Sequence, residues 1–218
     1  MHNEKYNKVL TVILIVLVSA ILAIIGYLGY GMYQKHVNDK ETAEVLETFD
    51  KLIVEMGNQE NNNEPTNLTT SGGQYIGGIN INSLYYRGYK VIGKLEMPSV
   101  NLQYPILDML KDAKAIDYSV AMQYGAGINK VGNTIIIGHN TNNGTFFGKN
   151  KKMNIGNRIY ITDIEGNRIE YEIYNKYITA GSDYSYSNQN TEGHREVTLV
   201  TCDRNNKNRL ILCAKEVK

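Results

Sequence analysis

An uncharged, apolar run over residues 9–33 limits the possible folds of this chain more than any other feature. The run consists mainly of Val, Ile, Leu, Ala and Gly. It exceeds the ~20 helical residues that span a bilayer core of about 30 Å. A cleaved signal peptide has a shorter apolar core, of about 7–15 residues, followed by a small-residue cleavage site, whereas Ala20 and Ala23 lie inside this run. We therefore expect an uncleaved, single-pass anchor in the lipid bilayer.

Lysines on both sides of the run bear on its orientation. Lys5 and Lys8 precede it within residues 1–8, and the positive-inside rule then predicts a cytoplasmic N-terminus. Lys35 and Lys40 on the far side weaken this bias. The sequence thus predicts a cell-membrane protein in which everything after residue 34 lies outside the cell.

A helix and a linker are expected between the anchor and the globular part. Residues 34–56 are interpreted as a stalk helix, because apolar side chains recur there at helical spacing: Val45, Phe49, Leu52, Ile53 and Met56. Whether this helix packs on the domain, pairs with a copy of itself or lies on the membrane is left open. Residues 57–78 are rich in Asn, Glu, Thr and Gly, which favours a flexible linker.

Residues 79–218 carry the pattern of one all-β domain with little helix. β-branched and alternating apolar runs are separated by turn signals, such as the Glu-Gly-Asn of residues 165–167. Residues 112–124 are the exception and are expected to form a helix or an irregular crossover. The chain has a net charge of +1 and 42% hydrophobic residues, which suits one domain with a real core and gives no reason to expect nucleic acid as a partner.

Two of the expected strands form a hairpin that carries reactive side chains. Residues 196–202 read as a buried strand that ends at Cys202, and a polar turn leads to Arg209, which opens the next strand. The hairpin would place both residues at the same end of one sheet, where a nearby cation favours the thiolate. The alternative is an inert cysteine packed as a small hydrophobe.

A second strand end supplies a partner for the thiol. Residues 133–138 form a β-branched run that ends in glycine and leads directly to His139. Histidine can act as a general acid and base near neutral pH, a thiolate can attack a carbonyl carbon, and Arg209 can hydrogen-bond the charge that develops on the carbonyl oxygen. Cys202, His139 and Arg209 together therefore indicate nucleophilic catalysis.

At these residues the chain resembles the sortases, the cysteine transpeptidases of Gram-positive cell surfaces. The matching pieces are TLVTC at residues 198–202, the Gly-His pair that ends at His139, and Arg209 at the start of the next strand. The resemblance runs from about residue 90 to the C-terminus. It implies a closed or nearly closed β-barrel of about eight strands with short helices.

The resemblance also implies an activity. Cys202 would be the nucleophile, His139 the general acid and base, and Arg209 the residue that stabilises the oxyanion or orients the substrate. The enzyme would cleave a Leu-Pro-x-Thr-Gly-like sorting signal through a thioacyl intermediate and pass the surface protein to an amine of a peptidoglycan precursor or a pilin. Two alternatives remain open: a cysteine peptidase that only hydrolyses its target, and a non-catalytic surface binding module.

Further residues near the motifs are predicted to take part in substrate binding. Substrate contacts are assigned to five side chains near the motifs: Thr201, Asn140, Tyr184, Tyr186 and His194. We expect no cofactor and no metal, because residues 123–134 lack the carboxylates through which some sortases bind calcium. The class is left between the A-like and the D- or E-like types. Cys213, inside an apolar strand, is expected to be a buried free thiol.

Overall fold

The structure is a computed structural model that describes residues 2–61, 84–203 and 207–217. The chain divides into two compact units, residues 1–41 and residues 42–218. Each unit is described by itself below. Most of the predicted linker, residues 62–78, lies outside the described residues.

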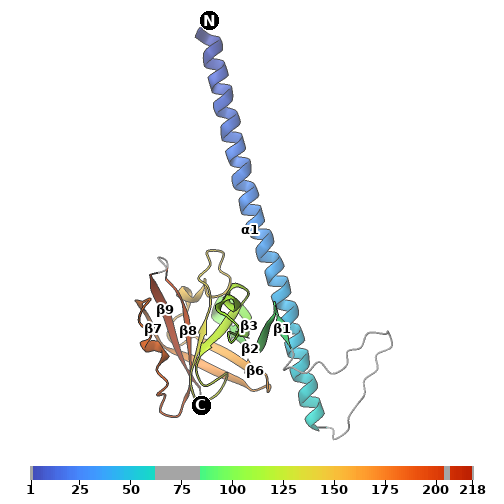
Figure 1. Cartoon of the computed structure of the whole chain (residues 1–218), viewed down its shortest axis with the longest axis vertical. Coiled ribbons are helices and arrows are strands. Elements are labelled where there is room, and N and C mark those ends of the chain that lie inside the picture. The colour runs from blue at the N-terminus through green and yellow to red at the C-terminus, as the bar shows by residue number, and fades with distance from the viewer. Residues whose placement is uncertain (1, 62–83, 204–206, 218) are drawn as a thin grey trace, which may run out of the picture. The chain divides into compact units, whose positions relative to one another are not determined.

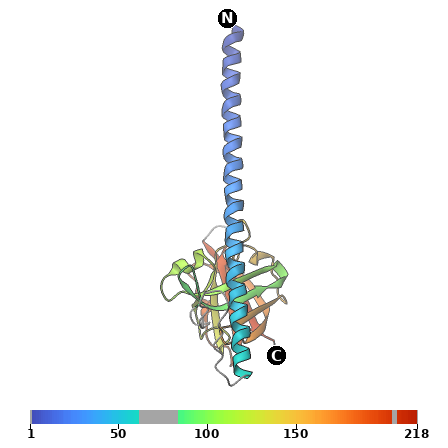
Figure 2. The ribbon, with the colours of Figure 1, turned by 90° about the vertical axis from the view of Figure 1, so that its right-hand side faces the viewer.

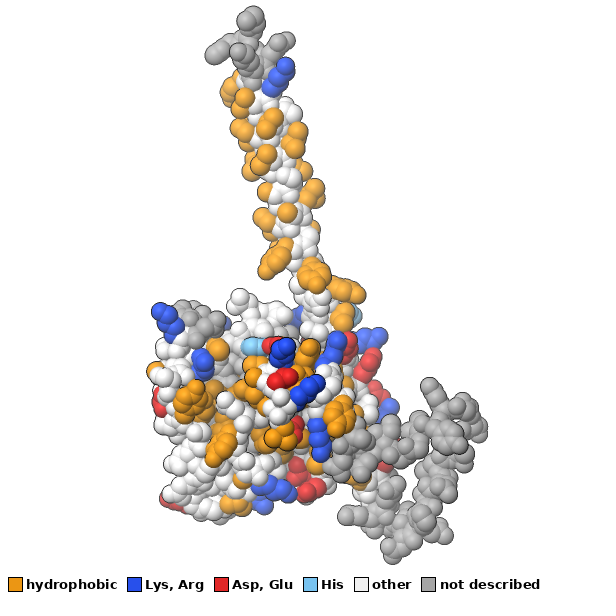
Figure 3. Space-filling view, in the orientation of Figure 1, with side chains coloured by type: hydrophobic (Ala, Val, Ile, Leu, Met, Phe, Trp, Pro, Cys, Tyr) orange, Lys and Arg blue, Asp and Glu red, His pale blue; other side chains and the backbone are white. Residues whose placement is uncertain are grey.

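A single helix, α1 (His2–Asn61), contains both the predicted anchor and the predicted stalk (Figure 1, Figure 2). No proline interrupts it, so the backbone hydrogen bonds continue past residue 33. Side chains of residues 6–33 are exposed and predominantly hydrophobic (Figure 3). By length and composition, α1 is the one helix among the described residues that could cross a membrane.

The second unit is a closed β-barrel, as predicted. Its strands are β1 (Tyr85–Tyr86), β2 (Tyr89–Met97), β3 (Leu102–Asp108), β4 (Val120–Tyr124), β5 (Gly132–Ile137), β6 (Arg158–Asp163), β7 (Arg168–Ala180), β8 (Arg195–Cys202) and β9 (Asn208–Glu216). They pair in the order β1-β2-β3-β4-β5-β8-β9-β7-β6, and an additional pairing of β2 with β6 closes eight of them into a barrel. The short β1 is an extra strand on β2. Closure leaves the eight-stranded sheet without free edges.

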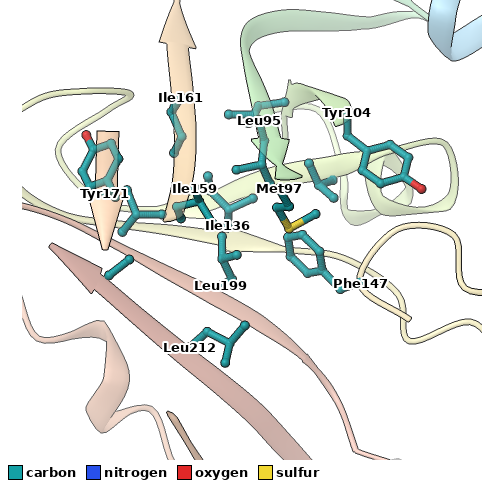
Figure 4. Packing of buried hydrophobic residues seen from close by; sticks show 14 of the residues in the cluster. Leu95, Met97, Tyr104, Ile136, Phe147, Ile159, Ile161, Tyr171, Leu199 and Leu212 are labelled. Atoms are coloured by element: carbon teal, nitrogen blue, oxygen red, sulfur yellow. The ribbon is translucent and has the colours of Figure 1, made fainter. Parts of the chain in front are cut away.

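Alternation along the strands fills the barrel with large apolar side chains. Leu95 of β2, Leu199 of β8 and Leu212 of β9 are fully buried and point into one interior (Figure 4). Phe147, from the segment after β5, packs against the same cluster. Burying each such side chain stabilises the fold by roughly 1.5–3 kcal/mol. The core contains Ile136 of β5 and Leu199 of β8, and it therefore fixes the positions of these two strand ends relative to each other.

The C-terminal part of α1 belongs to the barrel unit. Phe49 is fully buried in a second cluster with Leu107 of β3 and Ala121 of β4. The half of the stalk that carries the apolar positions therefore packs on the domain, one of the options that its amphipathic pattern left open. Lys94 of β2, which is largely buried, donates a hydrogen bond to Asp50 of the helix. The compact unit begins at residue 42 and includes the whole of the predicted barrel domain, residues 79–218.

The crossover expected at residues 112–124 consists of a short 3-10 helix and a strand. The helix η3 (Ala113–Asp117) is followed directly by β4, which runs parallel to β3. A parallel pair requires a crossover between its strands, and η3 forms part of it. The other 3-10 turns among the described residues are η2 (Pro98–Val100), η4 (Asn150–Lys152) and η5 (Ser185–Ser187).

Candidate active site

The parallel pairing of β5 with β8 aligns the predicted histidine with the predicted cysteine. The last paired residues are Ile137 of β5 and Val200 of β8. His139 lies two residues beyond the first, and Cys202 lies two residues beyond the second. Adjacent strands are about 4.8 Å apart, so this register places the two residues at the same level of the barrel rim.

Cross-strand hydrogen bonds fix this rim. The buried hydroxyl of Thr201 donates to the carbonyl oxygen of Gly138 at 2.7 Å. The side-chain amide of Asn140 donates to the carbonyl oxygen of Cys202, also at 2.7 Å. These two predicted substrate contacts thus bind the backbone beside the nucleophile and hold the His139 segment against the Cys202 segment.

Arg209 lies across from Cys202 on the other neighbouring strand. Cys202 and Arg209 are paired in the antiparallel register of β8 and β9. The guanidinium lies beside Gly181: a Cβ at that glycine would be 3.5 Å from Nη1 of Arg209 and only 2.7 Å from the carbonyl oxygen of Lys207. A larger residue at position 181 would therefore disturb the segment that carries Arg209.

His139 is held by its backbone and by a carboxylate. Its carbonyl oxygen accepts a hydrogen bond from the backbone N–H of Phe147 at 3.0 Å. Its ring meets the edge of Phe146 with the centroids 6.4 Å apart. The ring atom Nε2 lies 2.9 Å from Oδ1 of Asp117, the last residue of η3. The imidazole is thus oriented from two sides, while 42% of its side-chain surface stays exposed.

Asp117 is not among the site residues predicted from the sequence. It lies 22 positions before His139, inside the segment for which the sequence predicts either a helix or an irregular crossover. The signal that could identify it is a carboxylate just before a strand that pairs with the strand of His139. Recognising that signal requires the pairing of β4 with β5, which the one-dimensional pattern does not contain.

The loop between β7 and β8 starts beside Arg209. Thr179 of β7 pairs with Arg209 in the strand register, and its hydroxyl is hydrogen-bonded to Asp183. Tyr184 is exposed, whereas Tyr186 of η5 is buried. Burial and the neighbouring Tyr184 raise the pKa of Tyr186, and the positive charge of Arg209 acts in the opposite direction. Of the two tyrosines, the exposed Tyr184 is the one that a bound peptide could contact.

His194 lies at the other end of β8 from Cys202. Its carbonyl oxygen accepts a hydrogen bond from Gly132, the first residue of β5. Cys202 lies eight positions after His194, at the far end of β8, a distance of roughly 26 Å at about 3.3 Å per residue. The fold therefore does not bring His194 together with the other predicted site residues.

Among residues 2–61, 84–203 and 207–217, no group of three or more His, Cys, Asp or Glu side chains is placed to hold an ion.

The model of the sortase domain matches residues 95–217, more than half of the chain, and this segment includes His139, Cys202 and Arg209. The chain belongs to the sortase family. Sortase A of Bacillus anthracis is 27% identical to it over 114 residues, which are 52% of this chain. The match also covers 52% of that relative, so the comparison spans about half of its length.

Solved sortase structures share the fold. A Clostridium perfringens sortase D5 transpeptidase superimposes with a TM-score of 0.59 and 22% identity, covering 82% of this chain and 99% of that one. A lid mutant of sortase A from Corynebacterium diphtheriae has a TM-score of 0.54 and 21% identity, covering 79% of this chain and 95% of that one. Listeria monocytogenes sortase A superimposes with a TM-score of 0.53 and 23% identity, covering 59% of this chain and 88% of that one. These structures carry different class letters, and the class of this sortase stays open.

Proposed function

We propose that this sortase is a membrane-anchored cysteine transpeptidase whose active site is the barrel rim at Cys202. The observation that carries the proposal is the strand register: β5, which leads to His139, and β9, which carries Arg209, both pair with β8, which ends at Cys202. A nucleophile, a proton carrier and a fixed cation are the three groups that acyl transfer from a peptide needs.

In the first half of the reaction, the Cys202 thiolate attacks the carbonyl carbon of a peptide bond in the sorting signal. A C–S bond forms, and the negative charge that develops on the carbonyl oxygen is stabilised by the Arg209 guanidinium. The C–N bond then breaks, and His139 gives its proton to the departing amine. The product is a thioacyl enzyme and a released C-terminal peptide.

In the second half, an amine attacks the thioacyl carbon. His139 takes the proton from the incoming nitrogen, the new C–N bond forms, and the C–S bond breaks to restore the thiolate. Water in place of the amine would give hydrolysis instead. The partly exposed Cys202 and His139 are accessible to either acceptor, so the product has to be identified by experiment.

Membership of the family supports a proposal for the substrate and its partners. We propose a surface protein with a Leu-Pro-x-Thr-Gly-like signal as donor and an amine of a peptidoglycan precursor or a pilin as acceptor. Residues 9–33 would span the membrane, with residues 1–8 in the cytoplasm and the barrel outside the cell. Tyr184, exposed in the loop that starts beside Arg209, is proposed to contact the signal peptide.

The test uses the full-length protein in detergent micelles. A library of quenched Leu-Pro-x-Thr-Gly-type peptides is incubated with and without an amine acceptor, and the products are identified by mass spectrometry. We expect an amine-linked product with the wild type and no product with Cys202→Ala. Hydrolysis alone in the presence of abundant amine would identify a peptidase. No turnover by the wild type, with a Cys202 inert to thiol reagents, would favour a binding module.

A further inference from the structure

We propose that Asp117 is a positioning residue for His139, which holds a proton on Nε2 and leaves Nδ1 as the nitrogen that exchanges protons at Cys202. This inference deepens the proposed function and rests on it. It concerns a residue outside the Cys-His-Arg set, contributed by a different part of the barrel.

The first step is the chemistry of the contact. Oδ1 of Asp117 lies 2.9 Å from Nε2 of His139, within hydrogen-bond distance. An ionised carboxylate can only accept hydrogen bonds, so the nitrogen that faces it carries the hydrogen. A neutral His139 is then the Nε2–H tautomer, and its second nitrogen, Nδ1, has a free lone pair.

The second step concerns what the contact contributes. The side chains of Asp117 and His139 are 56% and 42% exposed, and ion pairs as exposed as this one add little to stability. Asp117 is therefore not needed to hold the barrel together. Orientation of the ring and choice of its tautomer are effects that a solvent-accessible pair can still supply.

The third step is the rigidity of the segment that presents Asp117. Ala115 of η3 is fully buried in the cluster that contains Phe49 of α1. Just after η3, the buried hydroxyl of Ser119 donates to the carbonyl oxygen of Pro105 at 2.6 Å. The Asp117 carboxylate therefore belongs to a segment that is held by the burial of Ala115 and by the hydrogen bond of Ser119.

The start of the same segment is also held. Oδ1 of Asp112 accepts hydrogen bonds from the hydroxyl of Tyr89 at 2.7 Å and from the backbone N–H of Lys114 at 2.8 Å. The bond to Asp112 raises the pKa of Tyr89 to about 12, and the bond to Tyr89 lowers the pKa of Asp112. Both groups thus keep the ionisation states that the contact needs across the neutral range. With both ends of η3 fixed, Asp117 has a defined place relative to His139.

The experiment reads the tautomer directly. Full-length protein with ¹⁵N-labelled histidine is prepared in detergent micelles as wild type, Asp117→Ala and Asp117→Asn, and long-range ¹H–¹⁵N spectra assign the neutral tautomer of His139. Glu165→Gln is the matched control, because Glu165 also belongs to an exposed ion pair, with Lys130 at 3.2 Å. Thermal unfolding of each variant shows that the fold is retained.

We expect the Nε2–H tautomer in the wild type and in the control, and a mixture that includes Nδ1–H in Asp117→Ala. Asp117→Asn keeps an accepting oxygen and is expected to restore most of the wild-type tautomer. In the peptide assay, kcat should fall about 10–100-fold in Asp117→Ala with little change in KM, as for a misoriented catalytic group. An unchanged tautomer, with kcat within about twofold of the wild type, would overturn the proposal.

The tautomer readout needs no turnover, so it separates this inference from the proposed function. If Cys202→Ala retained full activity, the proposed function would fail whatever the spectra show. If Cys202→Ala were inactive while Asp117→Ala kept both its activity and its Nε2–H tautomer, only the role of Asp117 would fail.

Discussion

The two cysteines of this sortase occupy neighbouring strands yet differ in almost everything that governs thiol chemistry. Cys202 ends β8 at the barrel rim, is partly exposed and is paired with Arg209. Cys213 lies within β9, is buried and is paired with Thr198. The two thiols therefore differ in exposure and in their cross-strand neighbours, because Cys202 ends its strand and Cys213 lies within its strand.

The surroundings of Cys213 explain its expected inertness. It packs in a small cluster with Ile135, Tyr186 and Val200, and its sulfur lies 4.0 Å from the hydroxyl of Thr198. Burial raises the pKa of the Cys213 thiol, which disfavours the reactive thiolate. Both cysteines are free, as the strand register requires: their strand partners place them about four residues, or ~13 Å, apart along the strands.

The largest expected difference is in catalysis. Cys202→Ala should lower acyl transfer in the peptide assay by at least about 10³-fold, because the covalent intermediate cannot form. Cys213→Ala removes the other thiol and should leave the rate within about twofold of the wild type. Substantial turnover by Cys202→Ala would show that Cys202 is not the nucleophile.

Arg209 is the cross-strand partner of Cys202, whereas Cys213 is paired with Thr198. Arg209→Ala should lower kcat about 10²–10³-fold, the usual cost of losing an oxyanion donor. Arg209→Lys keeps the charge without the planar fork and should recover only part of the rate. Arg168→Ala is the control, because its guanidinium stacks on Tyr160 on another strand pair. Equal rates for the Arg209 and Arg168 variants would remove Arg209 from the site.

Thiol labelling measures the same contrast without a substrate. Iodoacetamide at neutral pH should modify Cys202 at least about 10²-fold faster than Cys213, because Cys213 is buried and its thiolate is disfavoured. Peptide mapping by mass spectrometry gives the two rates, and the same reaction in urea should bring them together. Comparable rates in the folded protein would contradict the burial of Cys213.

For stability, we expect substitution of Cys213 to have a larger effect than substitution of Cys202. Cys213→Ser places a hydroxyl in an apolar cluster and should lower the free energy of unfolding by about 1–3 kcal/mol. Cys202→Ser, at a partly exposed position, should change it by less than about 0.5 kcal/mol. Urea unfolding followed by circular dichroism supplies both values, and the reverse ranking would show that the rim thiol is the structural one.

The smallest effect concerns pH. The folded state keeps the Cys213 proton to a higher pH than the unfolded chain does, so unfolding releases a proton above the ordinary thiol pKa. The contribution of Cys213 to stability is therefore full below that value and is lost as pH rises above it. Urea midpoints between pH 8 and 10 should decline less steeply in Cys213→Ala than in the wild type. Identical slopes would exclude this linkage.

Much of the fold and of the central site can be predicted from local sequence patterns. β-branched runs that end in Gly-His and in Thr-Cys identify two strands and their ends, and the turn after Cys202 predicts the return to Arg209. The apolar run of residues 9–33 predicts a helix because no other structure satisfies the backbone in lipid. These features depend on neighbours in the chain, which the sequence displays directly.

The remainder depends on contacts between distant segments. The amphipathic spacing around Phe49 predicts a buried helix face, but the strands that cover it are chosen by the barrel's closure. Asp117 is aligned with His139 through the pairing of β4 and β5. The spacing of residues along the sequence does not reveal which strands pair. His194 is close to Cys202 in the sequence, yet the length of β8 places the two at opposite ends of the strand.

The central claim is that Cys202 forms an acyl intermediate that an amine then resolves. The most direct measurement is intact-protein mass spectrometry of the full-length protein mixed rapidly with a cleavable signal peptide, followed by peptide mapping. We expect a mass increase on Cys202 equal to the N-terminal peptide fragment, and this adduct should disappear when the amine acceptor is added. Signal cleavage without any adduct on Cys202, or an adduct on Cys213, would contradict this claim.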